Sequence, residues 1–445
     1  MKGIVRSLLH FVIALFGVVL VAASSQAETT ATASQARASA HRGTYFDLMS
    51  WLARRGLVTN PSASSRAPVL ATPNLDELSV STETFAGSNA DPTLPVWNFN
   101  VRSSRDGHRH AGTMVGTSPF TSPGSTSVPV QVVPLIIRTH TLATSFDPKT
   151  GILTTTPGEF TSDPTDEQSS CLSAPNNVPL NLIEQSPLFT PAAFSFGGVN
   201  VGTTQYVDAF MRGNFWNILG SNQSAYHVLL GPVQTLEPIE ISVPPNEGLA
   251  IEAAVLGMCA PLTVLDINWL DSYLNGTVLP RVTAHGGVNP GSLPLYFVYN
   301  VVEASPVTNL FTCCILGYHS VTGHPIPNQT YTIGDFDVTG AFPSSINDSA
   351  VLSHELGEWV NDPYTVNEVA PWGNTGQVFG CANALEVGDP LTGTEIPQVL
   401  GANGFKYDLQ ELAFYSWFIG APATGVNGWF SDNGTFLKDA GPPCP

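Results

Sequence analysis

Three apolar runs rich in β-branched residues place the strongest limit on how this chain can fold. Each has the length and composition of a buried strand, and together they cover residues 128–140, 293–304 and 310–323. Shorter strand segments, broken by turns, are predicted in residues 227–243. Four other segments carry apolar side chains at helical spacing: residues 204–219, 261–276, 345–361 and 409–420. Because strands and helices are mixed along the chain, we predict an α+β fold with a mixed sheet.

The N-terminus has the order of charged, apolar and small residues that is typical of a secretory signal. Lys2 and Arg6 precede an apolar run from Leu8 to Val21, and cleavage is predicted after Ala27. A retained N-terminal anchor is the alternative. The sequence has no other uninterrupted apolar run of about 20 residues, so no membrane span is expected after cleavage. We therefore expect a secreted protein, extracellular or periplasmic.

Residues 28–125 are rich in Ala, Ser, Thr, Pro and Gly and have little apolar periodicity. Apart from a short amphipathic helix expected in residues 45–55, this region is predicted to be a disordered or extended arm, either a flexible linker or a propeptide-like segment. Residues 126–445 are predicted to form the folded domain, with a β-rich first half, 126–260, as one alternative.

Acidic side chains dominate the predicted domain. Residues 151–445 contain four basic and 27 acidic side chains, and the formal net charge of the whole chain is −19. Such a surface repels nucleic acid and anionic membranes and favours cations. Nucleic-acid binding is therefore excluded from the functions considered.

All six cysteines lie in the predicted domain, and an even number in an exported chain predicts up to three disulfides. Their connectivity cannot be derived from the sequence. Cys313 and Cys314 are adjacent in an apolar run, and we expect each to pair with a distant cysteine. The absence of a CxxC pair argues against a cysteine-based zinc ribbon.

The segment SHELGEWVNDP, residues 353–363, resembles a zinc-protease helix in which the second histidine is replaced by Glu358. His354 and Glu358 are four residues apart on one helix face, so both can reach one ion, while Glu355 can activate water. A second carboxylate would make the site harder and more anionic, so calcium or manganese are alternatives to zinc. An ordinary amphipathic helix with its polar face in water is the simpler interpretation. Gly357 favours a function, because its small size lets another segment approach the helix.

A third ligand is expected from EVGDP, residues 386–390, where Glu386 and Asp389 flank a glycine turn. One or both carboxylates can then reach the ion held by the helix. A solvent-exposed acidic turn is the alternative. His319, at the end of the run 310–323, is a candidate oxyanion donor or partner of a ligand, although a structural histidine is the favoured interpretation of this position.

The motifs GYH (317–319), SHELGEWVNDP and EVGD occur in an order that resembles secreted bacterial zincin-like proteins with an HExxE helix. They are also similar to plant extracellular proteins of the Exordium (phosphate-induced) family. The resemblance covers about residues 290–392 and implies a zincin-like catalytic domain with an active-site helix. By this resemblance, His354 and Glu358 are helix ligands, Glu355 activates water, and Glu386 or Asp389 is the downstream ligand. Cys381 precedes EVGD instead of following it, so no disulfide is carried over.

The sequence thus predicts a secreted metallopeptidase of zincin type that acts on a peptide or protein substrate and holds zinc, with calcium as the alternative. A non-catalytic extracellular or cell-wall-associated binding protein, with a structural or vacant metal site, is the second interpretation. A carbohydrate-active enzyme is a third, based only on the many paired carboxylates. Neither a GxSxG motif nor a cysteine nucleophile is indicated.

Overall fold

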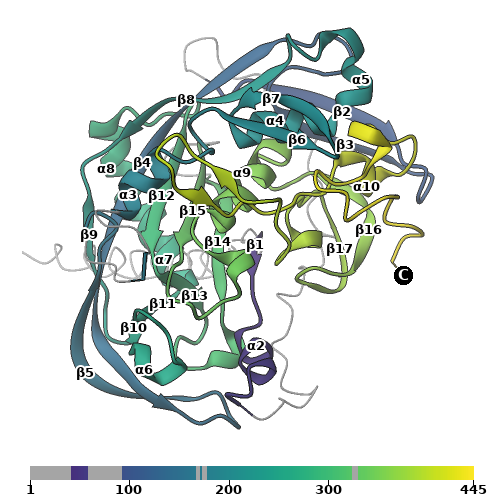
Figure 1. Ribbon diagram of the computed structural model, residues 1–445. Helices are drawn as coiled ribbons and strands as arrows, with labels where there is room; N and C mark the ends of the chain where they lie inside the picture. Colours follow the sequence, from purple (N-terminus) through teal and green to yellow (C-terminus); the bar gives the residue numbers. More distant parts are fainter. Residues whose placement is uncertain (1–41, 59–92, 167–170, 173–177, 323–328, 445) are drawn as a thin grey trace, which may run out of the picture. The chain divides into compact units, whose positions relative to one another are not determined.

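The computed structural model in Figure 1 is built mainly of β-strands. Strands account for 39% of the described residues and helices for 23%. The structure describes residues 42–58, 93–166, 171–172, 178–322 and 329–444. The predicted signal peptide, residues 1–27, and much of the predicted arm lie outside the described residues.

Seven strands form a closed β-barrel. The ring closes at β14, because Ile315 pairs with Glu303 of β13 while Gly317 pairs with Gly334 of β15. In order around the barrel, the strands are β14 (Ile315–Thr322), β13 (Val301–Ala304), β11 (Leu262–Asp266), β10 (Gly248–Ile251), β4 (Ser125–Phe146), β12 (Leu293–Tyr299) and β15 (Gln329–Phe336).

The predicted α+β fold with a zincin-like domain is therefore wrong. The closed, mostly β architecture depends on pairings between strands that lie far apart in the sequence, which apolar periodicity does not encode. One segment predicted as a helix also contains a strand. Residues 261–276 begin with β11, in which alternating side chains are buried on the two faces, and only then form α7 (Ile267–Tyr273).

The longest strand, β4, has 22 residues and organises much of the sheet. Besides its two barrel neighbours it pairs with three more strands: β5 (Leu153–Ser162), β8 (His227–Thr235) and β9 (Ile239–Ser242). The predicted strands at 128–140 and 227–243 are confirmed by β4, β8 and β9. Strands β12, β13 and β14 confirm those at 293–304 and 310–323.

Short helices and hairpins surround the barrel (Figure 1). The hairpins are β2 (Val96–Arg102) with β3 (Arg109–Val115), β6 (Ala192–Phe196) with β7 (Val199–Thr204), β16 (Glu368–Thr375) with β17 (Val378–Ala384), and β18 (Val399–Leu400) with β19 (Lys406–Tyr407). Besides α7, the α-helices are α2 (Leu48–Arg54), α3 (Pro179–Glu184), α4 (Tyr206–Asn214), α5 (Trp216–Leu219), α6 (Ala253–Leu256), α8 (Leu279–Gly286), α9 (Ala350–Asn361) and α10 (Tyr415–Ile419). None of the helices in the described residues is long and apolar enough to span a membrane.

The predicted helix at 204–219 is confirmed as α4 and α5, whereas the one at 409–420 is only partly correct, because α10 begins at Tyr415. The predicted helix at 45–55 is confirmed as α2. Ordered structure begins before residue 126, the predicted start of the folded domain. Strand β1 (Arg42–Tyr45) pairs with β14, and Trp97 and Phe99 of β2 are buried in the main core.

Helix α9 (Ala350–Asn361) lies against β14 and β15 at the glycine pair Gly317 and Gly334. A Cβ at Gly317 would lie 2.8 Å from a side-chain carbon of Val351, and one at Gly334 would lie 2.6 Å from Leu352. Both distances are too short for a real contact, so these glycines allow the helix to approach the barrel wall. The large core cluster that includes Leu352 and Trp359 holds the helix from its other side.

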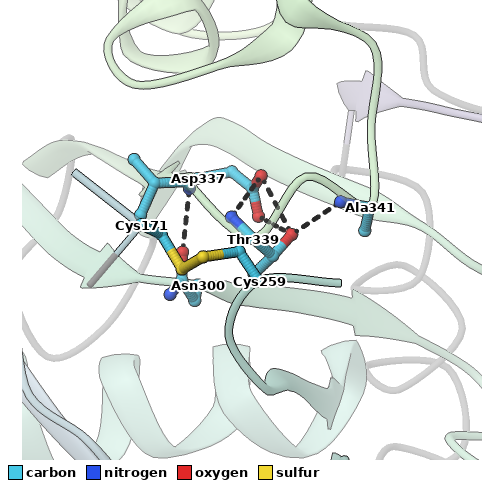
Figure 2. Close-up of a disulfide and its surroundings, with 7 residues drawn as sticks. Cys171, Cys259, Asn300, Asp337, Thr339 and Ala341 are labelled. Carbon is cyan, nitrogen blue, oxygen red and sulfur yellow. Dashed lines mark hydrogen bonds between the residues drawn. A yellow bond between two sulfur atoms is a disulfide. The ribbon is translucent and has the colours of Figure 1, made fainter. Parts of the chain in front are cut away.

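The six cysteines form three disulfides: Cys171–Cys259, Cys313–Cys314 and Cys381–Cys444. The expectation that Cys313 and Cys314 have distant partners is wrong, because they pair with each other. Figure 2 shows Cys171–Cys259 beside the segment after β15, where Thr339 accepts a hydrogen bond from the Cys259 amide and donates one to Asp337. Three disulfides are consistent with an oxidising compartment.

Removing the Cys171–Cys259 disulfide should destabilise the protein by about 2–4 kcal/mol, because the bond closes a long loop in the unfolded chain. The two residues are 88 apart in the sequence. Urea unfolding of Cys171→Ala/Cys259→Ala measures this loss. The matched control is Cys313→Ala/Cys314→Ala, which opens no loop and should cost less. Equal losses would contradict this explanation.

Candidate metal centre

Helix α9 carries the HExxE motif in the interior of the protein. It follows the buried pair Asp348 and Ser349 and ends before Pro363, which cannot continue a helix. His354, Glu355 and Glu358 have 0% of their surface exposed. The interpretation of a polar helix face in water is therefore excluded.

His354 presents one ring nitrogen to two carboxylates. Its Nδ1 lies 3.0 Å from Oε1 of Gln410, whose own amide nitrogen donates to the Gly388 carbonyl. Because Gln410 Oε1 can only accept, Nδ1 carries the hydrogen. Nε2 lies 3.0 Å from Oε1 of Glu358 and 3.5 Å from Oδ1 of Asp389. Nε2 therefore points at both carboxylates and can bind either a proton or an ion. Although burial alone would lower the pKa of His354, Glu358 and Asp389 raise it well above its usual value.

The EVGD turn closes over the helix and binds Glu358 through its backbone. The amides of Gly388 and Asp389 donate to Oε1 of Glu358 over 3.1 and 3.2 Å. Gly388 also packs flat on the imidazole, since a Cβ there would lie 2.6 Å from the ring of His354. Another segment does approach the helix at Gly357, because a Cβ there would overlap the side chain of Leu412.

His319 of β14 lies at the centre of the acidic cluster. Its Nδ1 is 3.4 Å from Oε2 of Glu355 and 3.7 Å from Oε2 of Glu358. Its Nε2 is 3.8 Å from Oε2 of Glu386 and 3.2 Å from the carbonyl oxygen of Asp362. The two acidic residues of EVGD thus face different histidines: Glu386 faces His319, and Asp389 faces His354.

Burial and like charge set the electrostatics of this centre. Burial raises the pKa of Glu358 well above its usual range, and Asp389 and Glu386 add to this effect while His354 opposes it. Burial also raises the pKa of Asp389, to about 6. Although burial alone would lower the pKa of His319, its hydrogen bond to Glu355 and the neighbouring carboxylates raise it to about 10. The centre therefore needs protons or a cation to neutralise its carboxylates.

Two groups of side chains in the described residues have the geometry to hold a metal ion. One is His354, Glu358 and Asp389, and the other is His319, Glu355 and Glu358, each with ligand atoms within 4.8 Å of one another. The residues fit an ion, because the buried Nε2 of His354 and Oε2 of Glu358 have no hydrogen-bond partner. The ion-pair partners of Glu355, Glu358 and Asp389 in the described residues are His319 and His354, without a Lys or Arg.

All six sequence-predicted site residues meet in this centre, and three others were missed. Gln410 orients His354, Gln377 donates to Asp389, and Thr44 donates to Glu355. Each comes from a segment without a recognisable motif, and Thr44 lies in the predicted arm. Of the other contacts in this centre, only that of Gly388 with His354 was indicated by the sequence, because this glycine lies between the two acidic residues of EVGD.

Comparisons of the chain with models of protein families, with curated proteins and with solved structures gave no match. The resemblance to HExxE and Exordium proteins therefore stays a prediction based on three short motifs.

Gly388→Ala should displace His354 and destabilise the protein by about 1–3 kcal/mol, because the new methyl group overlaps the imidazole ring. Urea unfolding measures the change. Gly276→Ala is the control, since a Cβ at Gly276 meets nothing within 4 Å. It should leave stability unchanged or raise it by up to about 1 kcal/mol, because Gly276 lies in a helical segment. If both variants unfold at the same urea concentration, the contact between Gly388 and His354 is not essential.

Proposed function

We propose that this protein is an exported, metal-dependent hydrolase that acts on peptide bonds. The observation that supports this most is the buried group of His354, Glu358 and Asp389, in which Nε2 of His354 and Oε2 of Glu358 have ion-pair contacts but no hydrogen-bond partner. Buried polar atoms without partners are rare and costly unless a ligand satisfies them. An imidazole with two carboxylates is a ligand set suited to a divalent cation, with zinc proposed first and calcium as the alternative.

His354, Glu358 and Asp389 would hold the ion, and Gln410 would keep His354 in the required tautomer. Such an ion supplies a Lewis acid that stabilises negative charge on the carbonyl oxygen of the substrate. Glu355 accepts a proton from water as the water oxygen bonds to the carbonyl carbon, and it passes that proton to the nitrogen when the C–N bond breaks. His319 positions Glu355 from a distance of 3.4 Å.

Export is part of the proposal. It is supported by the three disulfides and by the N-terminal sequence of charged, apolar and small residues. The excess of acidic side chains fits a protein that works away from nucleic acid.

One observation favours a second candidate function. Every predicted ligand is buried, with Asp389 the most exposed at 9%. A closed centre of this kind suits a structural cation in a non-catalytic extracellular binding protein. The two functions differ in the role of Glu355. It lies beside the ion in both, but it accepts a proton from water only in the hydrolase.

His354→Ala should remove the ion from the purified protein. We expect one divalent cation per chain in the unsubstituted protein, measured by elemental analysis, and an affinity at least about 100-fold weaker in the variant, because losing even an outer partner of a ligand costs about 10–100-fold. Exposed His285 provides the control variant His285→Ala, which should retain the ion. A metal-free unsubstituted protein would contradict the proposal.

Glu355→Gln should retain the ion but lower the hydrolysis of an unfolded polypeptide by about 10²–10⁴-fold, since it loses the group that accepts the proton. Rates are measured by the appearance of new amino termini during long incubation. Glu237→Gln, at an exposed glutamate, is the control and should leave the rate unchanged. Ion binding without hydrolysis in any form of the protein would favour the structural cation instead.

A further inference from the structure

We propose that β1 is a built-in occupant of the substrate position, which lies along β14 and takes an extended polypeptide. In this arrangement Thr44 blocks Glu355, and displacement of β1 opens the centre. The inference rests on the proposed function in one respect: only in a hydrolase does the contact of Thr44 with Glu355 inhibit a reaction. The edge of β14 and the contacts of Thr44 stand independently of it.

The barrel does not need β1 for its closure. Gly317 pairs with Gly334 of β15 on one side of β14 and with Thr44 of β1 on the other. Ile315 likewise pairs with Glu303 of β13 and with Tyr45. The ring of seven strands is closed by β13 and β15 alone, so β1 covers an edge that would otherwise be open. An open edge of this kind accepts an extended peptide through main-chain hydrogen bonds.

Thr44 occupies one oxygen of the proposed proton acceptor. Its backbone amide and its hydroxyl both donate to Oε1 of Glu355, over 2.9 and 2.5 Å. The other oxygen, Oε2, lies 3.4 Å from Nδ1 of His319. Thr44 itself is 1% exposed, so water does not reach Glu355 from this side. With two donors on Oε1, this oxygen cannot accept a proton from water until Thr44 leaves.

The contacts that hold β1 are mostly made to its backbone. Gln377 accepts from the amide of Tyr45 over 2.7 Å and donates to the carbonyl of Gly43 over 2.8 Å. Beyond the strand, Phe46 and Cys314 exchange two backbone hydrogen bonds of 2.8 Å. Backbone contacts accept many sequences, so the same groups can hold another extended chain.

The position of Gly43 restricts which chains fit. A Cβ on this residue would collide with the carbonyl oxygen of Gly317 and lie 2.7 Å from Cβ of Tyr318. The residue after it, in the place of Thr44, points a short side chain at Glu355. The site therefore favours an extended segment with glycine followed by a small residue.

Displacement of β1 is tested with Thr44→Pro in the full chain, which removes both hydrogen bonds to Glu355 and disfavours docking. Hydrogen exchange of the backbone amides in Cys314–His319 should accelerate by about tenfold or more, because one hydrogen bond to a charged group is worth about that factor. Adding the synthetic peptide Arg-Gly-Thr-Tyr-Phe, the sequence of residues 42–46, should slow the exchange again. The same peptide with alanine in place of glycine should not.

The matched control is Thr435→Pro, because Thr435 also donates its amide and hydroxyl to a buried carboxylate, that of Glu411. It should leave exchange in Cys314–His319 within about twofold of the unsubstituted rate, the change expected for a distant, independent site. If Thr44→Pro does not fold, Thr44→Val with Thr435→Val repeats the comparison, with only the hydroxyl lost in each.

Unchanged exchange in the Thr44 variant, or exchange that the glycine peptide does not slow, overturns the inference. These readouts require neither an ion nor hydrolysis, so they are separate from a failure of the proposed function. Where an ion is bound, Thr44→Pro should also lose it to a chelator faster and should hydrolyse unfolded polypeptide faster than the unsubstituted chain. Faster exchange that the glycine peptide reverses, without hydrolysis in any form of the protein, supports the removable strand at β14 and counts only against the proposed function.

Discussion

Four carboxyl groups and two imidazoles are closed off from water where α9 crosses β14 and β15, and much of the surrounding structure serves to satisfy them. Charged groups cost several kcal/mol each to bury unless they are paired or hydrogen-bonded. The EVGD turn supplies two backbone amides to Glu358, Gln410 supplies an acceptor for His354, and Thr44 supplies two donors to Glu355. Three distant segments of chain are thereby held against one helix.

The close contact between α9 and the barrel explains why this cluster can exist. Gly317 and Gly334 form a cross-strand pair under the helix, and they have no side chains to hold it away. His319, two residues after Gly317 on the same strand, then reaches the carboxylates of the helix. In the motif GYH, the glycine thus allows the helix to lie close to β14, and this short distance brings the histidine within reach of the helix carboxylates.

The sequence was sufficient for the helix and for the proximity of His354 and Glu358, because both depend on local spacing. A separation of four residues places His354 and Glu358 on one face in any α-helix. The barrel could not be predicted in this way, because its closure depends on β14 pairing with both β13 and β15. β11 was mistaken for helix, since Leu262 and Leu265 also fit helical spacing. Thr44 and Gln410 carried no signal, as their roles come from contacts across 311 and 56 residues.

The burial of the centre is unequal, and this inequality bears on the choice between catalysis and a structural ion. Asp389 is the most exposed of the predicted ligands, and it is bonded to Gln377, which also holds the backbone of β1. The cover on this side is therefore a strand of four residues that the barrel does not need for closure. A structural ion would gain nothing from the proposed displacement of β1, since its value lies in permanent ligation. A hydrolase needs such a route, because its substrate must displace something to reach Glu355.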